Sequence, residues 1–124
     1  MARILVIDDE ELLRKTVRVI LEVDGHEVLE AADGDLALGI LRAQGADLVL
    51  VDMFMPKRDG LEVIRALRDV MPRPKIVAMS GGGKTGQLDM LSAAAAMGAA
   101  RTIAKPFQPR ELLAVIRDVL TEPG

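Results

Sequence analysis

The amino-acid sequence predicts one α/β domain in which five parallel strands alternate with five helices. Short apolar runs recur along the 124 residues, and the segments between them carry apolar residues at helical spacing. Glycine or proline follows each of the first four helical segments, as is usual where helices end. This alternation is typical of a parallel sheet that is covered by helices on both faces.

The expected strands are short and mostly apolar. Four of them end just before a polar residue, and they span residues 3–7, 46–51, 75–79 and 102–104. The fifth, residues 26–31, alternates polar and apolar residues, which predicts a half-exposed edge strand. The runs that end at Ile7 and Val51 look buried on both faces, so we expect them at the centre of the sheet.

The expected helices are defined by start signals and apolar stripes. Acidic residues open the first two, at residues 9–11 and 33–35, and Pro109 suits the first turn of the last. The inward-facing residues are expected to be Leu13, Val17, Ile20 and Leu21; Leu36, Ile40 and Leu41; Val63, Leu67 and Val70; Leu88, Leu91 and Ala95; and Leu112, Ile116, Val119 and Leu120. Right-handed crossovers and a buried first strand favour the flavodoxin-like, doubly wound (βα)5 fold, a five-stranded parallel sheet of order 2-1-3-4-5. We expect the domain to occupy residues 1–122, with 123–124 as a tail.

The composition narrows the function classes. Half of the residues are apolar but only two are aromatic, so the core must be aliphatic. The net charge of −3 offers no basic face for nucleic acid, and the absence of cysteine excludes disulfides and thiolate metal sites. No apolar run approaches the roughly 18 residues of a membrane span. We therefore expect a cytoplasmic protein without direct contact to nucleic acid or membrane.

Polar residues follow the four apolar strands: Asp8 and Asp9, Asp52, Ser80 and Lys105. A parallel sheet places them along one edge, outside which ligands of open α/β sheets bind. Taken alone, each aspartate is better explained as a residue that opens or caps a helix. Carboxylates at the ends of two central strands repel one another, however, and hard oxygen ligands suit Mg²⁺. Lys105 and Ser80 add a positive charge and a hydroxyl that suit phosphoryl oxygens.

Several short motifs occur in a fixed order. They are Ile7-Asp8-Asp9-Glu10, residues 48–53 followed by Met55-Pro56 and Asp59-Gly60, Met79-Ser80-Gly81, and Gly98-Ala99 ahead of Lys105-Pro106-Phe107. Any one of them is common. Together, in this order and spacing, they make the chain resemble the receiver domains of two-component response regulators, the CheY-like family. The resemblance covers residues 2–120.

The resemblance implies a role for each carboxylate. Asp52 would be the phosphoacceptor, whose attack on phosphorus gives an acyl phosphate. Asp9 and Asp52 would bind Mg²⁺ directly, together with the backbone carbonyl of Phe54, and Asp8 would help through water. Because a carboxylate is already ionised at neutral pH, a metal and a lysine suffice without a separate base.

The resemblance also implies partners for the reaction. Ser80 would donate to a phosphoryl oxygen, and Lys105 would pair with the phosphoryl group. The domain would catalyse only its own phosphorylation and dephosphorylation, so it is not expected to be a conventional enzyme. Its donor would be a histidine kinase or a phosphotransfer protein. Because residue 124 ends the sequence, we expect output through a separate partner, a homodimer, or a domain absent from this chain.

Two other functions compete with this interpretation. An interaction module that works without phosphorylation would be free to lose its chemical residues, yet every such position is filled. A flavin or nucleotide binder would need a phosphate loop after the first strand and aromatic rings to stack on the ligand. Residues 81–85 match a P-loop only in part, because Ala78 stands where that motif requires glycine.

One position departs from the family pattern. Thr102 stands three residues before Lys105, where the family often has a Tyr or Phe that turns inward on activation. We therefore expect the Gly-rich stretch after Ser80, residues 81–86, to carry more of the conformational change. His26, the only histidine, is expected at the surface and away from the acidic residues.

Overall fold

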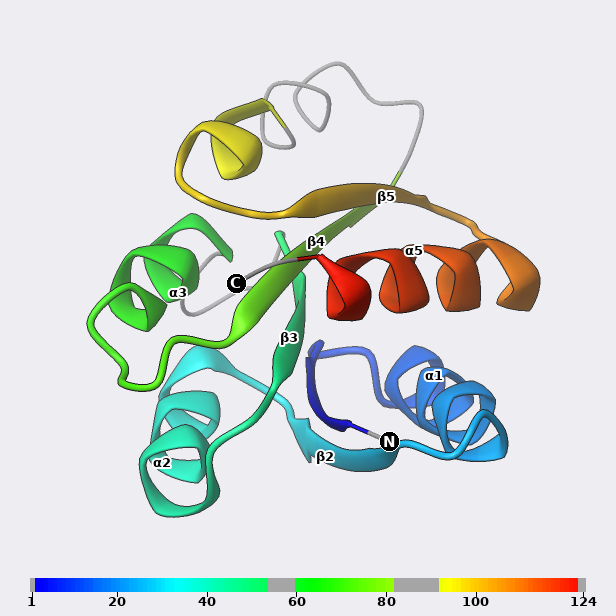
Figure 1. Cartoon of the computed structure of the whole chain (residues 1–124), viewed down its shortest axis with the longest axis horizontal. Coiled ribbons are helices and arrows are strands. Elements are labelled where there is room, and N and C mark those ends of the chain that lie inside the picture. The colour runs from blue at the N-terminus through cyan, green and yellow to red at the C-terminus, as the bar shows by residue number, and fades with distance from the viewer. Residues whose placement is uncertain (1, 54–59, 82–91, 123–124) are drawn as a thin grey trace.

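The computed structural model describes residues 2–53, 60–81 and 92–122, which form a parallel sheet with helices on both faces (Figure 1). The strands are β1 (Arg3–Ile7), β2 (Glu27–Ala31), β3 (Leu48–Asp52), β4 (Lys75–Gly81) and β5 (Arg101–Lys105). The helices are α1 (Glu11–Val23), α2 (Gly34–Gln44), α3 (Gly60–Leu67) and α5 (Pro109–Thr121), and residues 92–96 are also helical. The strand order β2-β1-β3-β4-β5 confirms the predicted flavodoxin-like topology.

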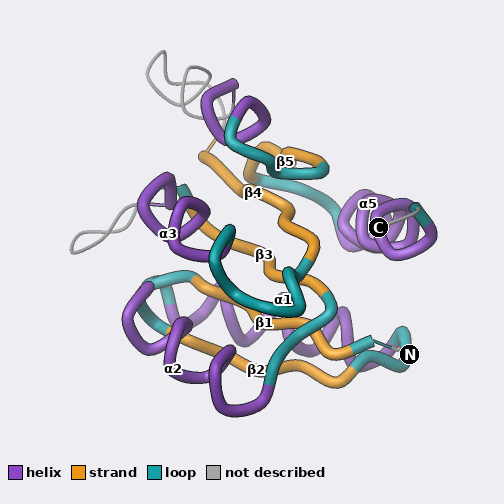
Figure 2. The backbone as a smooth tube through the Cα atoms, turned by 60° about the vertical axis from the view of Figure 1, so that its left-hand side comes forward, coloured by secondary structure: helices purple, strands orange, loops and turns teal. Residues whose placement is uncertain are grey.

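Two apolar layers enclose the sheet. α1 and α5 cover one face, and α2 and α3 cover the other (Figures 1 and 2). Along β1, Ile4 and Val6 pack in the α1/α5 layer, whereas Leu5 and Ile7 pack in the α2/α3 layer. These residues and residues 48–51 of β3 are fully buried, so the two central strands are buried on both faces, as predicted. Burial of each such aliphatic side chain contributes about 1.5–3 kcal/mol to folding.

Local signals define the helix ends. The Asp33 carboxylate accepts a hydrogen bond of 2.9 Å from the Leu36 backbone N–H and thereby caps the start of α2. Gly45 ends α2 with a φ of +73°, which glycine adopts without strain. Ahead of α5, the backbone N–H of Gln108 donates to Glu111 Oε1 at 3.0 Å, and Pro109 occupies the first turn. None of the described helices has the length and apolar character that crossing a membrane requires.

The buried face of α2 agrees only in part with the predicted one, since Leu41 is buried and Ile40 packs against the α2/α3 layer. Leu36, expected inside, is 55% exposed, whereas Ala37, Leu38 and Leu41 are buried. Together with Gly34, the three buried residues repeat at i, i+3, i+4 and i+7, which is one face of a helix. The prediction for Leu36 was wrong because it followed the large apolar residues and overlooked the small ones on the face that meets the sheet.

Smaller differences concern α3 and the segment before β5. α3 ends before Val70, which packs on the α2/α3 layer from the following turn rather than from the helix. Ala94 is buried and Ala95 is exposed, so the predicted inward position is off by one residue, or about 100° around the helix. Leu88 and Leu91 of the same predicted stripe lie outside the described residues.

The expectation of a surface position for His26 was wrong. Its side chain is only 8% exposed. His26 precedes β2 at the amino edge of the sheet, where its Nδ1 accepts a hydrogen bond of 3.3 Å from the backbone N–H of Ala2. Its Nε2 lies 3.5 Å from Asp24 Oδ2 at the end of α1. These contacts bury His26, although residues in turns are usually exposed. His26 lies at the edge of the sheet opposite the acidic residues, as expected.

Candidate functional site

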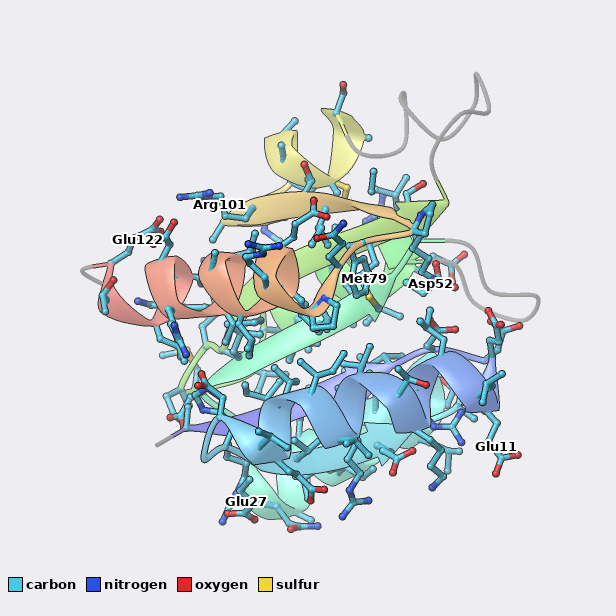
Figure 3. All side chains as sticks on the ribbon, turned by 90° about the vertical axis from the view of Figure 1, so that its right-hand side faces the viewer. Glu11, Glu27, Asp52, Met79, Arg101 and Glu122 are labelled. Atoms are coloured by element: carbon cyan, nitrogen blue, oxygen red, sulfur yellow. The ribbon has the colours of Figure 1, made fainter. Side chains whose placement is uncertain are left out.

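The polar residues predicted at the carboxyl ends of the strands share one edge of the sheet. Asp8 follows β1 directly, and Asp52, Ser80 and Lys105 lie at or next to the last residues of β3, β4 and β5. In Figure 3, Asp52 lies at one end of the molecule, and Arg101, which begins β5, lies toward the other. All strand pairs are parallel, so this arrangement confirms the predicted edge, where ligands of open α/β sheets bind.

Three carboxylates meet at this edge. One oxygen from each of Asp8, Asp9 and Asp52 lies within 4.8 Å of the others. Asp8 is 1% exposed and Asp52 is 5% exposed, whereas Asp9 is open to solvent. Mg²⁺ binds oxygens at 2.0–2.1 Å in an octahedron, so its opposite ligands stand about 4.2 Å apart. The 4.8 Å limit on these oxygens is close to that distance and their chemistry suits Mg²⁺, with the exposed side at Asp9 left for water and a ligand.

In the part of the chain that the structure describes, Lys105 faces these carboxylates. Its Nζ lies 2.9 Å from Asp8 Oδ2 and 3.5 Å from Asp52 Oδ1, and its side chain is 18% exposed. Removing carboxylates from water is costly unless opposite charge compensates them. Among the described residues, one ammonium faces three carboxylates, which leaves an excess of negative charge in this part of the structure. The site can accept a divalent cation for the same reason.

Side-chain alternation along the strands explains which groups meet. Asp8, Asp52 and Lys105 each lie two residues after a residue of the α1/α5 layer, namely Val6, Leu50 and Ile103. Residues two apart in a strand point to the same face, so these three converge. Ser80 lies two residues after Ala78, which belongs to the α2/α3 layer, and therefore approaches the edge from the other face.

Ser80 has hydrogen-bonding capacity that the described residues do not use. It is fully buried, and its Oγ has no hydrogen-bond partner within the described part of the chain. A buried hydroxyl without a partner costs about 1–3 kcal/mol. Ser80 pairs in register with Ala104, the neighbour of Lys105. Its hydroxyl therefore lies on the strand next to the one that ends in Lys105, and it can donate to a ligand that accepts a hydrogen bond.

The backbone of Asp8 is held by residues that the sequence analysis did not single out. Its N–H donates to Ala31 O at 3.1 Å, and its carbonyl accepts from Arg14 Nη1 at 2.8 Å. Arg14 Nε in turn donates to Glu30 Oε1 at 2.9 Å. No motif marks Arg14 or Glu30. Their only signal is opposite charge on two neighbouring elements, and a sequence contains many such pairs.

Two predicted features remain untested at this site. Phe54, whose carbonyl was expected to bind metal, lies outside the described residues, as do residues 82–86 of the Gly-rich stretch. Thr102 is half-buried in β5 and pairs in register with Ala78. It therefore lies on the strand that ends in Lys105, two register positions before Ala104, the partner of Ser80.

A doubly wound parallel sheet with this acidic, hydroxyl and lysine edge is the architecture of a receiver domain. The sequence pattern of the response regulator receiver domain matches residues 4–117. The chain therefore belongs to the response regulator receiver family, and its place is in two-component signalling.

Individual relatives agree with this assignment. The chain is 39% identical over 118 residues to a probable transcriptional regulator, ycf27, of Porphyridium aerugineum, covering 95% of this chain and 48% of the relative. It is 36% identical over 120 residues to the transcriptional regulatory protein CpxR of Escherichia coli, covering 97% of this chain and 50% of the relative. The chain thus spans about half the length of these curated relatives.

Solved structures resemble the fold along its full length. The receiver domain of NtrX from Brucella abortus superposes with a TM-score of 0.90 at 32% identity, covering 97% of this chain and 99% of that one. The chemotaxis protein CheY4 of Vibrio cholerae superposes with a TM-score of 0.84 at 29% identity, covering 96% and 98%.

Proposed function

We propose that this receiver accepts a phosphoryl group on Asp52 in a Mg²⁺-dependent reaction and that phosphorylation changes its affinity for a partner. The observation that carries the proposal is the meeting of Asp8, Asp9 and Asp52 with the ammonium of Lys105 at the carboxyl edge of the sheet. The unused hydroxyl of Ser80 supports it further. The proposal applies to the domain over residues 1–122.

The acidic residues would hold the metal. Asp9 and Asp52 would bind Mg²⁺ directly together with the Phe54 carbonyl, and Asp8 would act through water. Bound Mg²⁺ would neutralise charge on the phosphoryl oxygens. Asp8, fixed by its buried position and by Lys105, contributes negative charge that attracts the cation.

The chain's own residues would do the rest of the reaction. An Asp52 carboxylate oxygen attacks phosphorus, the bond from phosphorus to the donor's histidine nitrogen breaks, and that nitrogen keeps the electron pair. The product is an acyl phosphate on Asp52. Lys105 pairs with the phosphoryl oxygens and Ser80 Oγ donates to one of them. Hydrolysis by water later restores Asp52, so the domain acts on itself and not on a pool of substrate.

The donor would be a histidine kinase or a phosphotransfer protein, and output would pass to a second protein, to a homodimer or to a further domain. An exposed apolar face on α1 supports a protein partner. Leu12, Val19 and Val23 are exposed and recur at spacings of seven and four residues, which places them on one side of the helix. The proposal includes a cytoplasmic location, which is consistent with curated relatives that are named as transcriptional regulators.

The decisive experiment is intact-mass analysis after incubation with acetyl phosphate, with and without Mg²⁺. The wild type should gain one phosphoryl group only when Mg²⁺ is present, and Asp52→Asn should gain none. Asp47→Asn is the matched control, because Asp47 precedes β3 at the opposite edge, where its carboxylate accepts from the Arg3 backbone N–H at 2.7 Å. This control should be labelled like the wild type.

Two other outcomes would contradict the proposal. An Asp52→Asn variant labelled as strongly as the wild type would move the acceptor to another residue. A wild type that neither bound Mg²⁺ nor gained a phosphoryl group would favour the alternative, an interaction module of the same fold that acts without phosphorylation. If the wild type bound Mg²⁺ but gained no label from acetyl phosphate, labelling should be repeated with a phosphohistidine protein.

A further inference from the structure

We infer that Arg14, held by Glu30, is a positioning residue for the acidic site. This inference rests on the proposed function, because the site that it positions is the proposed Mg²⁺ and phosphoryl site. Arg14 does not approach the site as a ligand. It acts on the backbone of Asp8, which leads into Asp9.

The guanidinium of Arg14 joins two acceptors at once. Its Nη1 donates to Asp8 O at 2.8 Å and its Nε donates to Glu30 Oε1 at 2.9 Å. The Arg14 side chain is 12% exposed and that of Glu30 is 10% exposed, so both bonds are largely shielded from water. A planar guanidinium presents donors in fixed directions. Fixing one edge on Glu30 therefore also fixes the donor that reaches Asp8.

The peptide group that accepts this bond connects the two aspartates. The N–H on the other side of Asp8 donates to Ala31 O at 3.1 Å. Both polar groups of the Asp8 backbone are thus tied to β2, one directly to Ala31 and one through Arg14 and Glu30. Since the Asp8 carbonyl lies in the plane of the Asp8–Asp9 peptide, its orientation sets the direction in which the exposed Asp9 carboxylate leaves the chain.

Two further cations share the Glu30 carboxylate through its other oxygen, and Arg18 among them supplies a matched control. Glu30 Oε2 accepts from Arg18 Nη1 at 2.7 Å and from Lys15 Nζ at 3.1 Å. Arg18 lies on the same helix as Arg14 and contacts the same carboxylate. Its hydrogen bonds go to Glu30 and Glu22, whereas Arg14 also donates to the Asp8 carbonyl. Arg18 and Lys15 also keep the Glu30 charge paired when Arg14 is removed, so Arg14 variants should fold.

Whether the affinity for Mg²⁺ rises or falls shows whether Arg14 acts through its charge or by positioning the metal ligands. Loss of any positive charge near the carboxylates should by itself raise the affinity for Mg²⁺, because a repulsive charge disappears. Loss of a group that orients the metal ligands should lower the affinity, typically 10- to 100-fold. Arg14→Ala and Arg18→Ala remove the same charge, and only Arg14→Ala removes the bond to Asp8.

The test is calorimetric titration of Mg²⁺ into the wild type, Arg14→Ala, Arg14→Lys and Arg18→Ala, all without a phosphoryl donor. We expect Arg14→Ala to bind Mg²⁺ about tenfold or more weakly and Arg18→Ala to bind it as tightly as the wild type or more tightly. Arg14→Lys keeps the charge but loses the planar guanidinium that donates to Glu30 and to Asp8 at the same time. It should therefore also bind Mg²⁺ more weakly than the wild type. Amide spectra without metal should show the Asp9 signal displaced in both Arg14 variants and unchanged in Arg18→Ala.

The outcomes distinguish this inference from the proposed function. Equal affinities for Arg14→Ala and Arg18→Ala, with the Asp9 signal unmoved, would overturn the role of Arg14 and leave the proposed function intact. An Arg14→Lys variant that matched the wild type would show that only charge matters at this position, which also overturns the inference. A wild type that bound no Mg²⁺ would overturn both proposals together.

Discussion

Lys105 Nζ lies 2.9 Å from Asp8 Oδ2, although the two residues are 97 positions apart in the chain. They come from β5 and β1, which are separated in the sheet by β4 and β3. Adjacent strands are about 4.8 Å apart, so the Lys105 and Asp8 side chains must reach toward each other across the ends of the two intervening strands. On the way the Lys105 ammonium comes to 3.5 Å from Asp52 Oδ1. A phosphoryl group on Asp52 would thus arrive beside a lysine whose present partners are carboxylates.

Replacing Lys105 with Ala should separate metal binding from phosphorylation. The substitution removes a cation that competes with Mg²⁺ for Asp8 and Asp52, so the Mg²⁺ affinity should be kept or increased. The phosphoryl group would lose its cationic partner, so formation of the adduct from acetyl phosphate should slow at least tenfold and the switch should fail. Calorimetry measures the affinity for Mg²⁺, and intact-mass analysis measures the rate of adduct formation.

The control for the lysine variant is Lys15→Ala, which removes an equal charge from an exposed position on α1. It should leave the rate of adduct formation near that of the wild type. If Lys105→Ala formed the adduct as fast as Lys15→Ala did, the assigned role of Lys105 would be wrong.

Replacing Ser80 with Ala should have opposite effects on stability and on the phosphorylated state. Because Ser80 Oγ has no partner within the described residues, its removal should leave the free energy of unfolding unchanged or raise it by up to about 1 kcal/mol. The phosphorylated form should lose a hydrogen bond, and the adduct should form more slowly. Urea unfolding followed by circular dichroism suits a chain without Trp or Tyr.

Ser92→Ala serves as the control for this variant, because Ser92 lies exposed in the helical segment 92–96. It should change neither quantity. A loss of more than about 1.5 kcal/mol in Ser80→Ala would indicate that the hydroxyl already makes a hydrogen bond in the resting protein.

Glu30 should make the stability depend on pH in the acid range. Burial alone raises the pKa of Glu30, but hydrogen bonds from Arg18, Lys15 and Arg14 outweigh it and lower the pKa from 4.5 to about 2. Between these values the unfolded chain binds the proton and the folded chain does not, so the free energy of unfolding rises with pH. The contribution is complete above about pH 4.5 and is lost as the pH falls through about 2.

Glu30→Gln should therefore flatten the pH dependence of stability between pH 5 and 2 by on the order of 2 kcal/mol. Glu27→Gln is the matched control, since Glu27 lies on the same strand and pairs with Arg3 at the exposed amino edge. Urea unfolding at several pH values measures both variants. The same pH dependence in the two variants would contradict the ion-paired state of Glu30.

Leu50 and Leu36 should differ sharply in their effect on stability. Leu50 in β3 is fully buried, so Leu50→Ala removes packed side-chain volume and should lower the free energy of unfolding by about 2–5 kcal/mol. Leu36 on α2 is 55% exposed, and Leu36→Ala should change it by less than about 0.5 kcal/mol. Urea unfolding of the two variants would also test which face of α2 is buried, and similar losses would contradict the packing described above.

Much of the fold could be predicted from local sequence. The buried strands that end at Ile7 and Val51, the edge strand before residue 32 and the strand order follow from periodicity and from the handedness of crossovers. The shared edge of Asp8, Asp52, Ser80 and Lys105 follows from the same topology. These features depend on the pattern of apolar and polar residues over a few consecutive positions, which can be read directly from a sequence.

What the sequence by itself determined was the fold, the receiver motifs and the edge at which the acidic residues gather. The tertiary structure alone decided that Lys105 pairs with Asp8, that Arg14 and Glu30 hold the Asp8 backbone, and that Ala37 rather than Leu36 faces the sheet. Each of these depends on the distance that a side chain spans between elements, or on the close approach that a small residue permits. Such distances are set when the layers pack, because packing density and not periodicity decides which atoms meet.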